Sequence, residues 1–187
     1  MSEFVKMVKD TEERMKRSSD AVQQSFAGVR SGRASSGMVE NIRVDYYGAQ
    51  TPLKQMANIT IPEPRMIVVH PWDVSAIKSI EKAILESDLG IPPIVEGKIV
   101  RLSVPPLTRE RREELVKIVH KQAEDGHVSV RSVRRDANEK VKQLEKEKKI
   151  TEDESFKAQA EIQKLTDRYI QLIDQAKSAK EKELAPG

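Results

Sequence analysis

A cluster of basic side chains between residues 130 and 142 carries the clearest chemical signal in the sequence. If this segment is helical, Val130 and Val133 point to one side, and the basic side chains fall within about 60° of another direction. Guanidinium groups bind phosphate through paired hydrogen bonds, so a row of them along a helix matches the phosphates of an RNA backbone. The residues predicted to bind RNA here are Arg131, Arg134, Arg135, Asn138 and Lys142.

The same helical face extends toward the N-terminus through Lys117, His120 and His127. The alternative interpretation is a solvated helix face whose charges are neutralised locally. Ion pairs three or four residues apart, such as Arg135–Glu139 and Glu139–Lys142, would do this. Spacing alone leaves both interpretations open.

Other chemistry finds little support in the sequence. The glycines around Gly28 and Gly32 lack the spacing and the Lys-Ser/Thr of a phosphate-binding loop, so we expect no GTP binding. His120 and His127 lie about two helical turns apart, too far to share a metal without further ligands. There is no cysteine. We therefore predict no catalytic site, no metal and no cofactor, and interpret the protein as not an enzyme.

Composition favours long solvated helices. Charged residues make up 34% of the chain and aromatic residues 4%, and the mean hydropathy is −0.59. With 33 Lys and Arg against 30 Asp and Glu, the net charge is only +3, so the distribution of charge matters more than its sum. No apolar run approaches the ~20 residues of a membrane span, and no apolar region follows the N-terminus. We expect a cytoplasmic protein with no membrane contact.

The prolines divide the chain into two architectures. Eight of the nine lie between Pro52 and Pro106, whereas the flanks contain almost no helix breakers. The N-terminal flank predicts a helix that ends at the glycines after Phe26. A second helix is expected over Thr108–Lys149, roughly 60 Å long. A third starts at the capping box Thr151–Glu154. Each has one apolar stripe, so together they predict an elongated three-helix bundle.

The predicted stripes advance by three or four residues. In the first helix the stripe is Phe4, Val8, Met15, Val22, Phe26 and Val29, with Thr11 and Ser18 or Ser19 in the gaps. In the third it is Ala158, Ile162, Leu165, Tyr169, Leu172, Ala176 and Ala179.

The middle of the chain predicts a small inserted β/α/β domain, which makes the whole chain α+β. Strands are expected at residues 42–46, 59–61, 66–69 and 99–104, and Asp73 should cap a short helix. Tyr46 is in phase with the core side of its strand, whereas the role of Tyr47 stays open. The predicted domains are 1–30 with 106–187, and 31–105. A flexible link containing Gly32 and Gly37 and a stiff one at Pro105 and Pro106 predict a hinge.

Five stretches spread over both predicted domains resemble the ribosome recycling factor family. They are VRSGRAS (29–35), DYYGAQTPLKQMA (45–57), EKAILESDLG (81–90), PPLTRERREELVK (105–117) and VRSVRRDANEKVK (130–142). The family's fold is a three-helix bundle interrupted by a small β/α/β domain. The resemblance places the family's key arginine at Arg134. It implies further RNA-facing positions at Arg131 and Arg112, and basic hinge residues at Arg30 and Arg33. His120 and His127 stand where many relatives carry arginine.

The resemblance also implies partners and a mechanism. A member of this family enters the post-termination ribosome as a monomer and lays its bundle against the rRNA of the large subunit. Elongation factor G, which binds the GTP, then drives the subunits apart for a new round of initiation. The alternative from the residues alone is an RNA-binding structural protein that stays bound to the ribosome.

Overall fold

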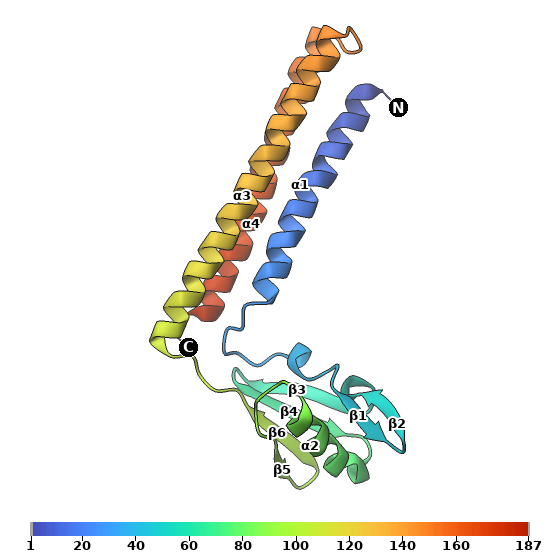
Figure 1. Ribbon diagram of the computed structural model, residues 1–187, viewed down its shortest axis with the longest axis vertical. Coiled ribbons are helices and arrows are strands. Elements are labelled where there is room, and N and C mark those ends of the chain that lie inside the picture. Colours follow the sequence, from blue (N-terminus) through green and yellow to red (C-terminus); the bar gives the residue numbers. More distant parts are fainter. Residues whose placement is uncertain (1, 187) are drawn as a thin grey trace. The chain divides into compact units, whose positions relative to one another are not determined.

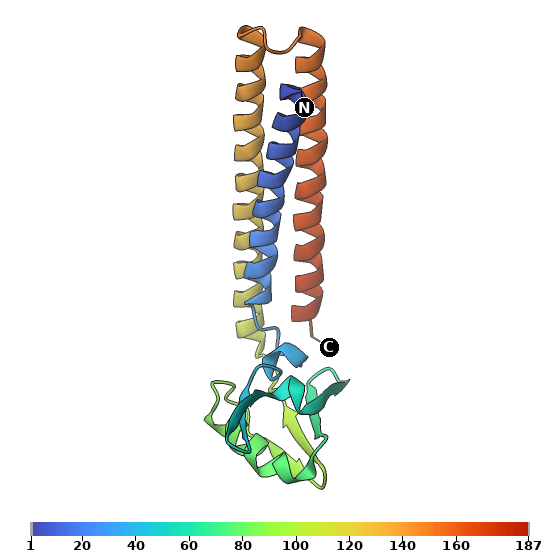
Figure 2. The same cartoon turned by 90° about the vertical axis from the view of Figure 1, so that its right-hand side faces the viewer.

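Three long helices lie side by side in one of the two units into which the chain folds (Figures 1 and 2). A computed structural model describes residues 2–186. The first unit contains the chain up to Ser31 and from Arg109 onward, and the second is Gly32–Thr108. The long helices are α1 (Glu3–Ala27), α3 (Arg109–Lys146) and α4 (Glu152–Leu184). None of the helices in this range is both long enough and apolar enough to cross a membrane. The predicted α+β class, a three-helix bundle interrupted by a β-containing domain, is confirmed.

The turn between α3 and α4 is built from local signals. Thr151 Oγ1 accepts a hydrogen bond from Glu154 N at 3.2 Å, and Thr151 N donates to Glu154 Oε2 at 2.8 Å, so the predicted capping box is confirmed. Helix α3 ends at Lys146 and not at the predicted Lys149, because Lys148 adopts a left-handed conformation with φ of 57°. The N–H groups of Lys148 and Lys149 donate back into the last turn, which closes the helix.

The buried stripe of α4 differs from the predicted one. From Ser155 to Ile173 the buried positions advance 18 residues in five steps, which is 3.6 residues a step. The predicted stripe advanced by 3.5 and placed Leu165 and Leu172 inside, but both are only half-buried. A straight helix drifts away from a seven-residue repeat by ~20° per heptad, and the buried positions follow that drift. The residues buried in α4 are Ser155, Ala158, Ile162, Thr166, Tyr169, Ile173 and Leu184.

A similar shift occurs in α1, where Met7 is buried, whereas the predicted Phe4 and Val8 are half-buried. Of the two serines predicted to fill the stripe, Ser19 is the buried one. The hydroxyl groups of the two threonines buried in the bundle both form hydrogen bonds. Thr11 Oγ1 donates to Met7 O at 2.8 Å, and Thr166 Oγ1 donates to Ile162 O at the same distance. Polar residues can therefore continue the stripe at little cost.

The three helices come close together at Gly126 of α3. A Cβ atom on Gly126 would lie 2.3 Å from Val22 Cγ2 of α1 and 3.2 Å from Ile173 Cδ1 of α4. Both neighbours are buried β-branched side chains with little freedom to move. Glycine in the middle of a helix costs about 1 kcal/mol relative to alanine. At position 126 the absence of a side chain is what allows the three helices to meet.

The smaller unit places helix α2 (Ile77–Glu86) on a four-stranded antiparallel sheet in the order β3-β4-β6-β5. A separate hairpin pairs β1 (Arg43–Tyr46) with β2 (Ala49–Pro52). The strands of the sheet are β3 (Ala57–Glu63), β4 (Met66–Pro71), β5 (Ile94–Glu96) and β6 (Ile99–Ser103). The core includes Val44, Leu53, Ile67, Ile80, Ile84, Val100 and Leu102.

The β2 and β5 strands were not predicted, because both are short and largely exposed and therefore lack an apolar alternation. The predicted cap is confirmed: Asp73 Oδ1 accepts from Ser75 N at 2.9 Å at the start of a short 3-10 turn that leads into α2.

We expect Gly126→Ala to destabilise the bundle, although alanine is the better helix former. Overpacking a core costs about 1–3 kcal/mol, and the gain in helix propensity offsets about 1 kcal/mol of it. The melting temperature followed by far-UV circular dichroism should fall by up to about 8 °C, which corresponds to a net loss of about 2 kcal/mol. Gly28→Ala is the matched control, because its Cβ would meet nothing closer than Ser25 O at 3.4 Å and its φ is −73°. A Gly126→Ala variant that melts at or above the parent temperature would contradict the packing described here.

Candidate nucleic-acid interface

One section of α3 carries cations that have no acidic partner. Arg134 is half-buried, and Arg135 and Lys142 are exposed. Among residues 2–186, none of these three side chains forms a hydrogen bond or an ion pair. The pairs Arg135–Glu139 and Glu139–Lys142, which the alternative interpretation required, do not form in this part of the chain. The positive charge of this section is therefore available to a ligand.

The first turns of α3 provide a contrast. There Arg109 pairs with Glu113 at 3.0 Å, and Arg111 pairs with Glu114 at 2.9 Å. Exposed pairs of this kind contribute little to stability, but they neutralise the local charge. These two arginines near the start of α3 are thus paired within the helix, whereas Arg134, Arg135 and Lys142 are unpaired among the described residues.

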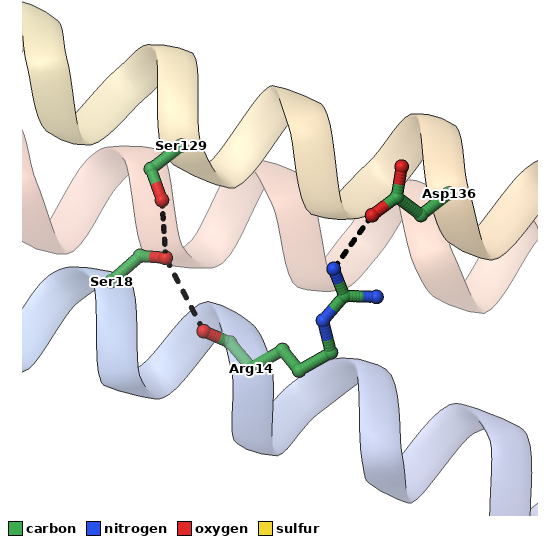
Figure 3. Close-up of polar contacts among 4 residues, drawn as sticks. All are labelled: Arg14, Ser18, Ser129 and Asp136. Carbon is green, nitrogen blue, oxygen red and sulfur yellow. Dashed lines mark hydrogen bonds and ion pairs between the residues drawn. The ribbon is translucent and has the colours of Figure 1, made fainter.

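The one acid inside the segment 130–138 turns toward α1. Asp136 Oδ2 accepts a hydrogen bond from Arg14 Nη2 at 2.6 Å, as Figure 3 shows. Two turns away, Ser18 and Ser129 share a hydrogen bond of 2.7 Å across the same pair of helices. Asp136 therefore holds α1 against α3 and leaves the arginines on the other side unneutralised.

Arg131 belongs to a chain of charged groups that reaches α4. Its Nη1 lies 3.7 Å from Glu124 Oε1, and Glu124 Oε2 lies 3.4 Å from His127 Nδ1. His127 Nε2 in turn lies 2.8 Å from Asp174 Oδ1 of α4. Glu124 thus bridges the histidine and the arginine, and gives Arg131 an acidic neighbour within α3.

The two histidines do not extend the basic face as predicted. The side chain of His127 is only 13% exposed and packs against α4, and His120 contacts Glu181 of α4. Glu181 and Asp174 come from a helix far along the chain, so helical spacing within α3 could not indicate them. These histidines join α3 to α4.

The remaining predicted residues lie apart or are partly covered. Asn138 is half-buried, and its Oδ1 is buried with no donor among the residues described. Arg112 is half-buried near the start of α3, about 28 Å along the helix from Arg131, and makes contacts of its own. The structure therefore brings Arg131, Arg134, Arg135, Asn138 and Lys142 together and leaves Arg112 separate.

The predicted hinge residues lie where the chain enters and leaves the smaller unit. Ala34 N donates to Pro64 O at 2.7 Å, and Val104 N donates to Arg65 O at 2.8 Å. One turn, between β3 and β4, therefore holds both connecting segments. Gly37 lies inside the short 3-10 turn Ser36–Met38, on the small-unit side.

Gly32 has a φ of 72°, and a Cβ on it would lie 2.9 Å from Leu107 Cγ. The two connecting segments thus run side by side at this point. Arg30 and Arg33 are exposed on the first segment, and Arg33 makes contacts of its own. Pro105 and Pro106 are exposed on the second, outside any helix or strand.

Comparison with known proteins gives a consistent match. The family model described as "Ribosome recycling factor" matches residues 22–184. The chain belongs to the ribosome recycling factor family. A ribosome-recycling factor of Natranaerobius thermophilus is 56% identical over 176 residues, covering 94% of this chain and 96% of that one. One of Symbiobacterium thermophilum is 51% identical over 178 residues, covering 95% and 96%.

Solved structures of the family share the fold. The solution structure of a ribosome recycling factor has a TM-score of 0.74 at 43% identity and covers 98% of both chains. A second similar chain, also 43% identical, has a TM-score of 0.64 and covers all of both chains. It comes from models of the T. thermophilus ribosome recycling factor and the E. coli elongation factor G bound to the E. coli post-termination complex.

We expect Gly32→Ala to lower the stability of the smaller unit by about 1–2 kcal/mol, because a left-handed backbone disfavours any Cβ. The added contact with Leu107 acts in the same direction. Gly37→Ala is the control, since its Cβ would meet only Ser35 Oγ at 3.4 Å. Hydrogen exchange of the β3 and β4 amides should report the difference. Equal exchange in the two variants would mean that Gly32 is not required for its backbone conformation.

Proposed function

We propose that this protein is a non-enzymatic translation factor that binds the post-termination ribosome and, with elongation factor G and GTP, releases it for new initiation. It acts in the cytoplasm, where translation takes place, and its bundle binds the rRNA of the large subunit. Membership of the ribosome recycling factor family supports this proposal, as does the similar chain placed with elongation factor G on a post-termination complex. The observation that carries the RNA contact is the group of unpaired cations on α3.

The physical argument for RNA rests on charge and geometry. Arg134 and Arg135 sit on a straight helix that packing with two neighbours holds rigid, so their positions are set before binding. A charge-assisted hydrogen bond contributes about 1.5–3 kcal/mol, and contacts to phosphate weaken as salt rises. Salt-sensitive phosphate contacts of this kind fit a factor that must bind the ribosome and then leave it, because the affinity then depends on a few exposed contacts.

The energy for release comes from the partner in this proposal. The sequence has no phosphate-binding loop of the Walker type, so elongation factor G supplies the GTP hydrolysis. The contribution of this chain is a rigid bundle together with a second unit attached through two segments, the residues around Gly32 and those around Leu107. Washing in high salt separates this function from that of a structural ribosomal protein, because a factor should dissociate and a structural protein should stay bound.

We expect Arg134→Ala to leave helicity and melting temperature nearly unchanged, within roughly 0.5 kcal/mol, because the guanidinium has no partner in the described structure. Affinity for purified large subunits should fall about ten- to a hundredfold, with a shallower salt dependence. Arg134→Lys should recover only part of the lost affinity. The compact ammonium group of lysine cannot form the paired hydrogen bonds that the planar guanidinium group of arginine makes with phosphate.

Arg17→Ala is the control for Arg134, since Arg17 is an exposed arginine of α1 that pairs with Glu13. Its affinity should equal that of the parent. Normal binding by Arg134→Ala, or a loss that is explained by unfolding, would show that Arg134 is not an RNA contact.

Glu124→Gln should strengthen binding, because the substitution releases Arg131 and removes a negative charge beside the basic residues. An exposed ion pair is worth about 0.2–1 kcal/mol, so affinity for the large subunit should rise about one-and-a-half- to fivefold. Glu113→Gln, which only releases Arg109, is the control. A lower affinity would instead mean that Glu124 holds Arg131 in its binding orientation.

A further inference from the structure

His127 lies between two carboxylates where α3 packs against α4. Its side chain is largely buried, and each of its ring nitrogens faces an acidic oxygen. Glu124 Oε2 of the same helix lies 3.4 Å from Nδ1, and Asp174 Oδ1 of α4 lies 2.8 Å from Nε2. The third helix, α1, meets this section of α3 through Val22 at Gly126, and within residues 2–186 no charged side chain of α1 pairs with His127.

The number of protons on the ring decides how it interacts with Glu124. A neutral imidazole carries one proton, and a charged imidazole carries two. Asp174, the closer carboxylate, favours the proton on Nε2 of the neutral ring, because a lone pair there would face a negative oxygen. Nδ1 then presents its own lone pair to Glu124 and cannot donate to it. The charged ring donates from Nδ1 as well, so protonation turns a repulsive contact into an attractive one.

Glu124 is shared between this ring and Arg131. Its Oε1 lies 3.7 Å from Arg131 Nη1, a longer separation than the 3.0 Å between Arg109 and Glu113 nearer the start of α3. Within residues 2–186, Arg131 has no other acidic partner. While the ring is neutral, the charge of Glu124 acts on Arg131. A charged ring competes for the same carboxylate, and Arg131 is then more available to phosphate.

We propose that His127 is a positioning residue for the rRNA contact, and that its charge state sets how far Glu124 neutralises Arg131. The inference deepens the proposed function and rests on it. Histidine is the side chain that ordinarily changes charge between pH 5 and 8, so affinity for rRNA should rise as the solution becomes more acidic within that range. Asp174 contributes by fixing the ring, so α4 adjusts a binding surface that α3 presents.

The pH dependence of binding tests this proposal. The affinity of the full chain for purified large subunits would be measured at constant salt between about pH 8 and about pH 6. We expect binding to become about one-and-a-half- to fivefold tighter at the acidic end, the range expected when an exposed ion pair is lost. His127→Gln, which is polar but does not titrate, should lose this rise. His120→Gln is the matched control and should keep it, because His120 contacts Glu181 and not Glu124.

Two further variants distinguish positioning from direct attraction between the ring and phosphate. Glu124→Gln and Arg131→Ala alter exposed side chains and should fold normally, so they decide the question even if His127→Gln is unstable. If His127 acts through Glu124 and Arg131, both variants should lose the rise in affinity at acidic pH.

A charged ring that attracted phosphate directly would preserve the rise in both variants, and that result would overturn the proposal. An equal rise in the parent and in His127→Gln would overturn it as well, while leaving the proposed function intact. A parent chain that binds large subunits at no pH in this range would mean that the proposed function fails, and this inference with it.

Discussion

The close contact of Gly126 with Val22 and Ile173 sets the distance at which the three long helices pack. No side chain separates the helices at this point, and buried stripes continue along all three helices on either side of it. The buried positions keep the 3.6-residue period of a straight helix, so the faces of α3 do not wind around the bundle. Side chains three, four and seven residues apart therefore stay aligned on one side, and the basic residues 131–142 depend on that alignment.

Packing and recognition use different sides of α3. Acidic side chains that could neutralise its cations are turned toward neighbouring helices: Asp136 pairs with Arg14, and Asp174 of α4 pairs with His127. These contacts hold the helices together and at the same time leave Arg134 and Arg135 unpaired within residues 2–186. The net charge is only +3, but this arrangement concentrates unpaired positive charge on one section of α3, where a polyanion can reach it.

The smaller unit uses different chemistry. One turn, Pro64–Arg65, holds both connecting segments, so the sheet is anchored to its own entry and exit. Its exposed side chains include the rings of Tyr47 and Trp72, whereas α3 exposes Arg131, Arg135 and Lys142.

The sequence by itself determined the features that local signals encode. Capping residues at Thr151 and Asp73, the clustering of prolines, and the apolar periodicity predicted the helices, most strands and the inserted domain, and five short stretches indicated the family. These signals depend on residues that are close together in the sequence, so they can be recognised before the fold is known. The domain limits, the hinge and the RNA-binding residues stay predictions.

Tertiary structure decided what depends on partners distant in the chain. It placed Thr166 and Ile173 inside in preference to Leu165 and Leu172, because packing selects the true helical period. It also turned the histidines of α3 toward acids of α4 and left Arg134 without a partner among the described residues. Whether a charge is paired depends on which helix lies opposite, and only the folded bundle brings those helices together.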